Sequence, residues 1–211
     1  PGYRLWQLCR SGALRPSGGI AVLVHESFDA SVSMWQPAST PSPYHMWLRF
    51  DSATCLRRPL FLAAAYLPPY RSKYGLKSPA EVEEYITLLG DEVAQASACP
   101  AGADVLLAGD MNAHTGSLPD VADHSKLLHA ALHEEAALDL APCTAQGSAF
   151  APPPRISTCT AAVCEQGKAL LQLCCITGML IANGRVHGDV PASTTCYSGQ
   201  SSSVVDYMAA S

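Results

Sequence analysis

The length, composition and charge of the chain first narrow its class. With 211 residues, 48% of them hydrophobic, it is long enough for one domain with a core and too apolar for a disordered protein. It has no apolar run near the about twenty residues that cross a bilayer, so no membrane span is expected. The net charge of −5 gives no support to a broadly basic nucleic-acid-binding surface. The first residues, PGYRLWQLCR, lack the features of a signal peptide, and the absence of an initiator Met indicates a fragment.

The nine cysteines are scattered along the chain, and no two of them form a C-x-x-C pair. Such a set is poor support for a disulfide framework or a zinc site. We therefore expect free thiols that pack as small apolar side chains in a reducing compartment.

Three apolar segments in the first third of the chain predict strands. The β-rich run Gly18–Val24, GGIAVLV, predicts a buried strand. The proline-rich segment Gln36–Pro43 predicts a loop. Beyond it, Tyr44–Phe50 and Leu60–Leu67 predict two strands that form a hairpin through Asp51–Pro59.

The next segment carries the start signals of a helix. Ser78 is placed as the N-cap, Pro79 as the first helical residue and Glu81 as the partner in a capping box. Apolar residues then recur at helical spacing, at Val82, Tyr85, Ile86, Leu89 and Val93. The apolar run Val105–Ala108 follows and predicts a buried strand, so the order strand, helix, strand indicates an α/β crossover unit.

The segment Ser125–Leu140 has the pattern of a second helix. His129 and His133 lie four residues apart and could share one face, as zinc ligands do. Without the H-E-x-x-H arrangement, however, a solvated polar face is favoured over zinc. Ala141–Ser157 is rich in proline, alanine and serine and predicts a surface loop.

The last third predicts one helix and three short strands. The helix covers Glu165–Thr177 and ends at Gly178, a residue suited to the left-handed conformation after a helix. The predicted strands are Met179–Ala182, Thr194–Tyr197 and Val204–Ala210, separated by turns at Asn183–Gly184 and Gly199–Ser203.

The stretch Leu106–Gly116, LLAGDMNAHTG, is the strongest candidate for a functional site. It has the pattern of a buried strand that delivers polar groups where it ends, and loops at strand ends commonly carry chemistry. Asp110 offers a charged oxygen, and Asn112 lies two residues later, so on an extended backbone both side chains point to the same side. The alternative is a strand that ends in a turn, with Asp and Asn as ordinary turn residues.

Two further residues need an explanation. Tyr66 ends an apolar strand just before two prolines that cannot continue a ladder, and it is either a site residue or a rim aromatic covering the core. Asp206 lies within the apolar run VVDYMAA, where a buried carboxylate is costly unless it is paired. It is either an edge-strand residue that faces water or a carboxylate held beside a histidine or a metal.

Several motifs together resemble one family. The blocks GGIAVLV, AAYLPP, LLAGDMNAHTG, LIANGRVHGD, TTCYS and SSVVDYMAAS resemble the endonuclease/exonuclease/phosphatase superfamily. Within it, they are similar to the AP-endonuclease-like domain of LINE-type retrotransposon polyproteins. The resemblance implies an α/β fold: a four-layer, DNase I-like sandwich of two packed, mixed and largely antiparallel sheets with helices outside. Residues 1–211 would then form a single domain, incomplete at both ends, whose exposed strands favour aggregation.

The resemblance also implies roles for individual residues. Asp110 would position or deprotonate the attacking water, and Asn112 would hold that water or the scissile phosphate. Tyr66 would contact the phosphate or support the site, and Asp206 would orient a catalytic histidine. Possible substrate-binding residues are Asn183, as a supporting residue, and Thr195 and Ser203, as donors to DNA phosphates.

The same resemblance implies a cofactor, partners and a location. Mg²⁺ (or Mn²⁺) would neutralise charge on the reacting phosphate, DNA would be the substrate, and a reverse transcriptase domain would follow in the polyprotein. The nucleus would be the place of action, and no membrane is involved.

Departures from the family pattern leave alternatives open. The family has a metal-binding Glu before the GGIA-like strand and a final Ser-Asp-His motif, and neither appears here, so no metal ligand is assigned. Pro69, Cys159 and Cys164 stand where Asn, Asp and Asn are common. Three hypotheses follow: an Mg²⁺-dependent DNA endonuclease fragment, a catalytically inactive relic of it, or a phosphatase of the same superfamily. We expect residues 1–211 alone to be inactive or nearly so.

Overall fold

The computed structural model describes residues 2–9, 18–29, 31–51, 56–116, 118–120, 153–157, 159, 161–198 and 201–211. The predicted helix at 125–140, with His129 and His133, and most of the predicted loop at 141–157 lie outside them. The elements are β1 (Tyr3–Cys9), β2 (Gly19–His25), α1 (Glu26–Asp29), β3 (Val32–Trp35), β4 (His45–Phe50), β5 (Leu60–Tyr66), α2 (Pro79–Ser97), β6 (Asp104–Asp110), α4 (Glu165–Thr177), β7 (Leu180–Ile181), β8 (Cys196–Ser198), β9 (Ser201–Ser203) and β10 (Asp206–Ala210).

A six-stranded mixed sheet forms the centre of the molecule. Its strand order is β3-β4-β5-β6-β10-β7, and two further pairs, β1-β2 and β8-β9, form small sheets of their own. Strands β5 and β6 are parallel and are connected through α2, whereas the other neighbours in the central sheet are antiparallel. The predicted α/β class and the crossover unit are therefore confirmed.

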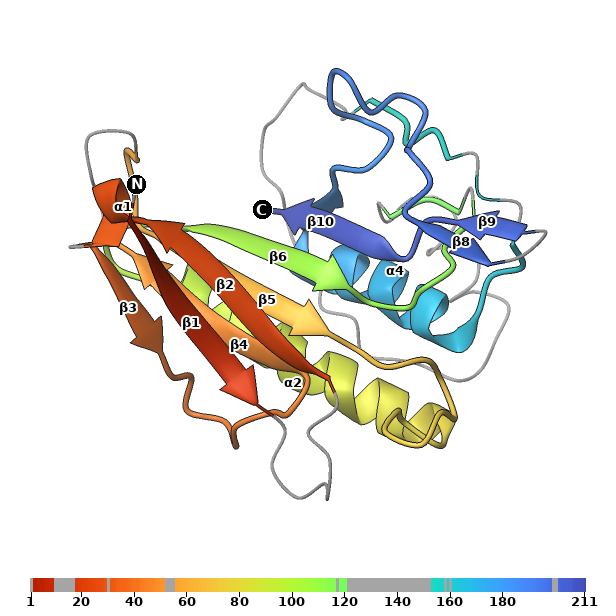
Figure 1. Ribbon diagram of the computed structural model, residues 1–211, viewed down its shortest axis with the longest axis horizontal. Helices are drawn as coiled ribbons and strands as arrows, with labels where there is room; N and C mark the ends of the chain where they lie inside the picture. Colours follow the sequence, from red (N-terminus) through yellow and green to blue (C-terminus); the bar gives the residue numbers. More distant parts are fainter. Residues whose placement is uncertain are drawn as a thin grey trace, which may run out of the picture.

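Helices α2 and α4 pack together on one face of the central sheet (Figure 1). Ser78 caps α2 as predicted, because its Oγ accepts a hydrogen bond of 3.2 Å from the Glu81 N–H. The Glu81 carboxylate accepts in return from the N–H of Lys77, at 2.9 Å, rather than from that of Ser78. All five predicted stripe residues of α2 are buried in the main core. Gly178 ends α4 with a φ of 73°, as expected of a left-handed cap.

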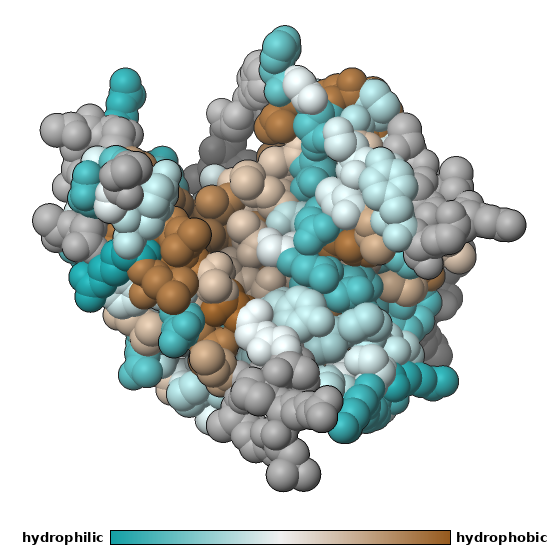
Figure 2. Space-filling view, in the orientation of Figure 1, coloured by the Kyte–Doolittle hydropathy of each residue, from teal (hydrophilic) through white to brown (hydrophobic). Residues whose placement is uncertain are grey.

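The described residues cover the opposite face of the sheet only in part. The β1-β2 hairpin packs there on a second core of Val24, Val32, Met46, Leu48 and Ala64. Beyond the hairpin, Figure 2 shows apolar side chains in a hollow between it and the region of β10. The prediction of a fully buried strand at 18–24 is wrong in one respect: burial alternates along β2, since only one face of the hairpin packs on the sheet. Leu23 on the other face is 65% exposed.

Two predicted boundaries near the carboxyl end are also wrong. Ser201–Ser203, predicted as part of a turn, forms β9 and pairs with β8. The predicted strand at Val204–Ala210 begins only at Asp206. The reason is local: the Thr195 hydroxyl oxygen accepts the N–H of Val205, at 3.0 Å, and so takes a donor that a ladder would use.

Two further expectations concern thiols and membranes. The described cysteines are free, and Cys174 is buried in the main core. In the described ranges, no helix is both long and apolar enough to cross a bilayer.

Candidate functional site

Three neighbouring strands of the central sheet bring the predicted site residues into one row. Tyr66 at the end of β5 is in register with Asp110 at the end of β6, and Asp110 is in register with Asp206 at the start of β10. Strands in a sheet are about 4.8 Å apart, and directly opposed residues present their side chains on the same face. We call Tyr66, Asp110 and Asp206 the site row.

The backbone around Asp110 has an unusual shape. Gly109 has a φ of 144°, and a Cβ at this position would lie 1.9 Å from the carbonyl oxygen of Ala65 on β5. Only glycine fits there, which explains the glycine before the aspartate. Asn112 is left-handed, with a φ of 45°, and its N–H donates to Asp110 Oδ1 at 2.8 Å. Its side-chain Nδ2 donates to the Leu67 carbonyl at 2.9 Å, so Asn112 ties the ends of β5 and β6 together.

Asp206 is held from both sides through its backbone. Its N–H donates to the Thr195 hydroxyl oxygen at 3.2 Å, and its carbonyl accepts from Asn183 Nδ2 at 3.3 Å. Asn183 Oδ1 also accepts the N–H of Met208 at 2.9 Å, and the Ser203 carbonyl accepts the N–H of Thr195 at 3.0 Å. Asn183, Thr195 and Ser203 therefore make contacts that fix the start of β10 or the strand before it, and their roles in substrate binding stay predictions.

The sequence suggested that Asp206 would lie inside a buried strand, and this is wrong. Asp206 is the first residue of β10 and is only partly buried. A partly hydrated carboxylate at a strand end costs far less than one in a core, so no buried partner is required.

Asp110 lies in an electrostatically unfavourable environment. Partial burial raises the pKa of its carboxyl, and the charge of Asp206 raises it further, although the hydrogen bond from Asn112 acts in the opposite direction. Among the described residues, neither carboxylate forms an ion pair with a cationic side chain. Within the described ranges, the row therefore carries a concentrated negative charge with no cationic side chain paired to it.

The donor set constrains which metal could bind. The described ranges contain no group of three or more His, Cys, Asp and Glu side chains that could hold an ion. Two carboxylates are too few for a structural zinc site, but they suit Mg²⁺, which keeps several waters and binds substrate phosphates. The unneutralised charge of Asp110 and Asp206 fits such a cation.

The histidine expected to partner Asp206 is not found in the described part of the chain. His45 is buried and bonds through Nε2 to Glu92 of α2 at 2.6 Å. The backbone N–H of His114 contacts Cys164 Sγ at 3.2 Å. No described histidine hydrogen-bonds to Asp206, so this predicted role has no partner here.

Sequence reasoning missed a polar network behind the row. The Tyr207 hydroxyl lies 2.9 Å from the Ala113 carbonyl and 3.0 Å from Thr115 Oγ1. One Nη of Arg155 donates to Thr115 Oγ1 at 2.9 Å, and the other donates to the Gly116 carbonyl at 3.1 Å. The network fixes the loop after Asn112. No local pattern shows that these residues meet, because Arg155 lies 40 residues from Thr115.

Comparisons with known proteins assign no family. No protein-family model matches the sequence, and no curated protein matches it significantly. The functional argument therefore depends on the site row and on the contacts that hold it.

Proposed function

We propose that this chain carries part of the active site of an Mg²⁺-dependent (or Mn²⁺-dependent) DNA endonuclease of the AP-endonuclease-like type that LINE-type retrotransposons encode. It would nick target DNA in the nucleus for a reverse transcriptase domain of the same polyprotein. One observation carries the proposal: Asp110 and Asp206 oppose each other at the ends of adjacent strands, beside Tyr66 and Asn112, with no described cation to neutralise them.

The chemistry of phosphodiester hydrolysis matches these groups. The reaction needs an in-line water, a base close to it and stabilisation of negative charge in the transition state. Asp110 would hold the water and accept its proton, since its carboxylate lies at the strand end beside Asn112. Asn112 would hold the water or the phosphate, and Tyr66 would donate to a phosphate oxygen. A bound Mg²⁺, held by Asp110 and Asp206, would supply positive charge at the phosphate.

The finer fold assignment is part of the same proposal. We infer a four-layer sandwich in which the central sheet and α2 and α4 form two layers. The β1-β2 hairpin, which packs on the opposite face, would belong to the second sheet. The partial cover of that face supports the idea that the domain is incomplete.

The second candidate is a catalytically inactive relic. It is favoured by the small donor set, which is limited to two carboxylates with no histidine bonded to Asp206 in the described ranges. Both candidates give the same expectation for residues 1–211 alone, namely little or no activity.

The complete transcript separates the candidates. It should be sequenced on both sides of this segment, and the encoded protein assayed for Mg²⁺-dependent nicking of supercoiled plasmid. We expect Asp110→Ala and Asp206→Ala each to reduce nicking by about 100-fold or more, as the loss of a catalytic acid or base does. Asp104→Ala is the matched control, since Asp104 starts the same strand β6 and pairs with Arg58 at 2.8 Å, at the opposite end from the row.

Other outcomes decide against the proposal. Nicking that survives both row substitutions would exclude the row as the active site. Release of phosphate from inositol phosphates without nicking would indicate a phosphatase. An open reading frame interrupted by stop codons, with no activity on either substrate, would indicate a relic.

A further inference from the structure

One loop concentrates positive charge in an otherwise acidic chain. Residues 69–77 read PYRSKYGLK and contain Arg71, Lys73 and Lys77 but no acidic residue, whereas the whole chain has a net charge of −5. We call this segment the basic loop. It begins three residues after Tyr66, so it leaves the sheet at the same edge as the site row.

The cations of the basic loop differ from four others in the described ranges, which pair with carboxylates. These pairs are Arg49 with Asp51, Arg58 with Asp104, Lys168 with Glu165, and Arg185 with Asp120. In the described ranges, no carboxylate lies within ion-pair distance of Arg71, Lys73 or Lys77. Lys77 Nζ donates to the Ser72 carbonyl within the loop, whereas Arg71 and Lys73 present positive charge without a described carboxylate partner.

Aromatic rings alternate with these cations. The Arg71 guanidinium carbon lies 5.1 Å from the centre of the Tyr70 ring, and Lys73 Nζ lies 5.1 Å from that of Tyr74. Cation–π contacts at this distance restrain the side chains without neutralising their charge. Alternating cations and aromatic rings are typical of surfaces that bind a nucleic-acid strand, where phosphates meet the cations and bases stack on the rings.

The loop is held in a fixed shape. Gln166 of α4 is 3% exposed; its Oε1 accepts the N–H of Tyr70 and its Nε2 donates to the Pro68 carbonyl, both at 3.0 Å. The N–H of Arg71 donates to the Leu76 carbonyl at 2.8 Å, which closes the loop on itself. A fixed loop loses little conformational entropy on binding, so its charges are positioned in advance.

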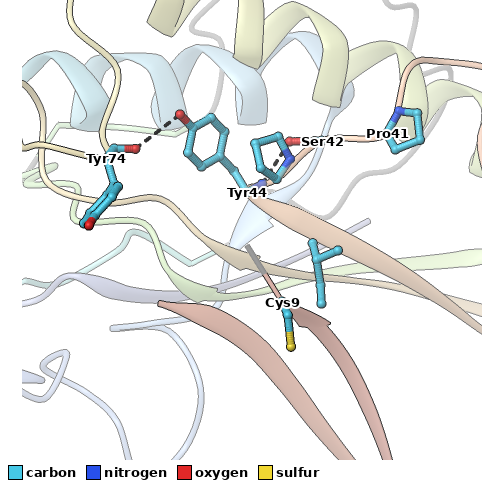
Figure 3. A pocket seen from close by; sticks show the side chains of 7 residues that line it. Cys9, Pro41, Ser42, Tyr44 and Tyr74 are labelled. Atoms are coloured by element: carbon cyan, nitrogen blue, oxygen red, sulfur yellow. Dashed lines mark hydrogen bonds between the residues drawn. The ribbon is translucent and has the colours of Figure 1, made fainter. Parts of the chain in front are cut away.

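A pocket adjoins the basic loop on the side away from Asp110. It has a volume of about 320 Å³ and is lined by Tyr74 and Tyr44, by Leu8 and Cys9 of β1, and by the segment 41–43 (Figure 3). The Tyr44 hydroxyl donates to the Tyr74 carbonyl at 3.3 Å. The Tyr44 carbonyl accepts the N–H of Tyr66 at 2.8 Å, so the pocket begins one strand beyond the site row. Aromatic walls of this kind suit a stacked or unstacked base.

We propose that the basic loop binds the phosphates of a DNA strand, through Arg71 and Lys73, and leads that strand from the site row toward the Tyr44–Tyr74 pocket. The proposal deepens the proposed function by naming the surface that holds the substrate. It rests on that function only for the orientation of the strand relative to the row, because binding itself needs neither a metal nor catalysis. An anionic membrane surface would also attract cations, but the interleaved rings and the neighbouring row favour DNA.

Binding can be measured without cleavage by fluorescence anisotropy in EDTA. The probe is a labelled single strand of about 20 nucleotides, longer than a typical binding site of this kind. We expect Arg71→Ala combined with Lys73→Ala to weaken binding about tenfold at moderate salt and to lower the slope of log K against log salt by about 1.4, or about 0.7 for each lost phosphate contact. The matched control is Arg57→Ala combined with Arg58→Ala, which makes the same change in net charge just before β5, at the opposite end of that strand.

Three results would overturn the inference. The first is that the unmodified chain does not bind the DNA probe at low salt. The second is that both double variants lose the same affinity for DNA. The third is that Arg71→Ala with Lys73→Ala loses binding to phosphatidylserine vesicles but not to DNA. The melting temperature of each variant identifies any unfolding, and Arg71→Gln with Lys73→Gln provides a second pair that keeps the side-chain length. Asp110→Asn should bind at least as tightly as the unmodified chain. If the protein encoded by the complete transcript binds the probe but does not nick plasmid, that result counts only against the proposed function.

Discussion

Two carboxylates in the same molecule have opposite surroundings. Glu92 of α2 is 1% exposed and accepts hydrogen bonds from His45 Nε2 at 2.6 Å, from Trp47 Nε1 at 2.8 Å and from the Ser39 hydroxyl. Burial alone would raise the pKa of its carboxyl, but these hydrogen bonds and the charge of His45 hold the pKa below its usual range.

The Asp110 carboxylate is less buried than that of Glu92, and it accepts fewer hydrogen bonds. It accepts from the N–H of Asn112, lies opposite the like charge of Asp206, and its pKa is raised by partial burial and by that charge. The fold thus surrounds Glu92 with donors where α2 meets the sheet and leaves Asp110 unneutralised at the sheet edge. A carboxylate kept in unfavourable surroundings at a strand end is typical of a functional position.

Removing Glu92 tests the structural side of this comparison and should have the largest effect. Glu92→Ala leaves the buried donors of His45 and Trp47 and the partly buried Ser39 hydroxyl without an acceptor, so we expect the free energy of unfolding to fall by about 3–5 kcal/mol. Because the folded-state pKa of Glu92 is lowered, its contribution is present above its unfolded pKa of about 4.3 and is lost as the pH falls through the folded value. Chemical denaturation at pH 7 and below measures both. Glu84→Ala, at an exposed position of the same helix, is the control, and equal losses in the two variants would refute the role of Glu92.

A methyl group at Gly109 tests whether the backbone beside Asp110 has room to adjust. Gly109→Ala would place its Cβ 1.9 Å from the Ala65 carbonyl oxygen at a φ of 144°, so we expect a loss of about 2–4 kcal/mol from overpacking and strain together. Gly178→Ala separates the two causes. It also has a positive φ, of 73°, but nothing lies within 4 Å of its Cβ, and it should cost about 1 kcal/mol. Thermal unfolding of both variants gives the difference, and similar losses would mean that the contact with Ala65 relaxes.

Local signals predicted α2 and α4, whereas the helix predicted at 125–140 lies outside the described residues. The cap of α2 and its buried stripe depend on residues within a few turns of one another, and the parallel β5–β6 pair follows from the strand, helix, strand order. Asp110 and Tyr66 could be placed together for the same reason, since strands that run parallel on either side of a crossover helix end at the same sheet edge.

The other features of the structure could not be predicted from local patterns, because they depend on contacts between segments that are far apart in the sequence. His45 and Trp47 approach Glu92 from 47 and 45 residues away, and no pattern within β4 or α2 indicates that they meet. The exposure of Leu23 depends on which face of the hairpin packs on the sheet, and alternation along a seven-residue strand does not reveal that. The late start of β10 follows from the Thr195 side chain, which competes with the ladder for a backbone donor.

Neutralising Asp110 tests the functional side of the comparison and should have the smallest effect, in the opposite direction. Asp110→Asn keeps the acceptor for the Asn112 N–H but removes a partly desolvated charge that faces Asp206. We therefore expect the variant to be slightly more stable at pH 7, by at most about 1 kcal/mol, or about 2–4 °C in Tm for a chain of this size.

The sign of the pH dependence makes this test decisive. A raised folded-state pKa means that the ionised Asp110 destabilises the fold. The contribution of Asp110 to stability is therefore most favourable below its unfolded pKa of about 3.9 and is lost as the pH rises through the folded value. The advantage of Asp110→Asn should consequently vanish below about pH 4. Asp104→Asn, which removes a carboxylate paired with Arg58, should show no such gain at pH 7. A loss of stability in Asp110→Asn at pH 7 would mean that a cation already neutralises Asp110. Asp110 and Glu92 would then differ only in the group that neutralises each carboxylate.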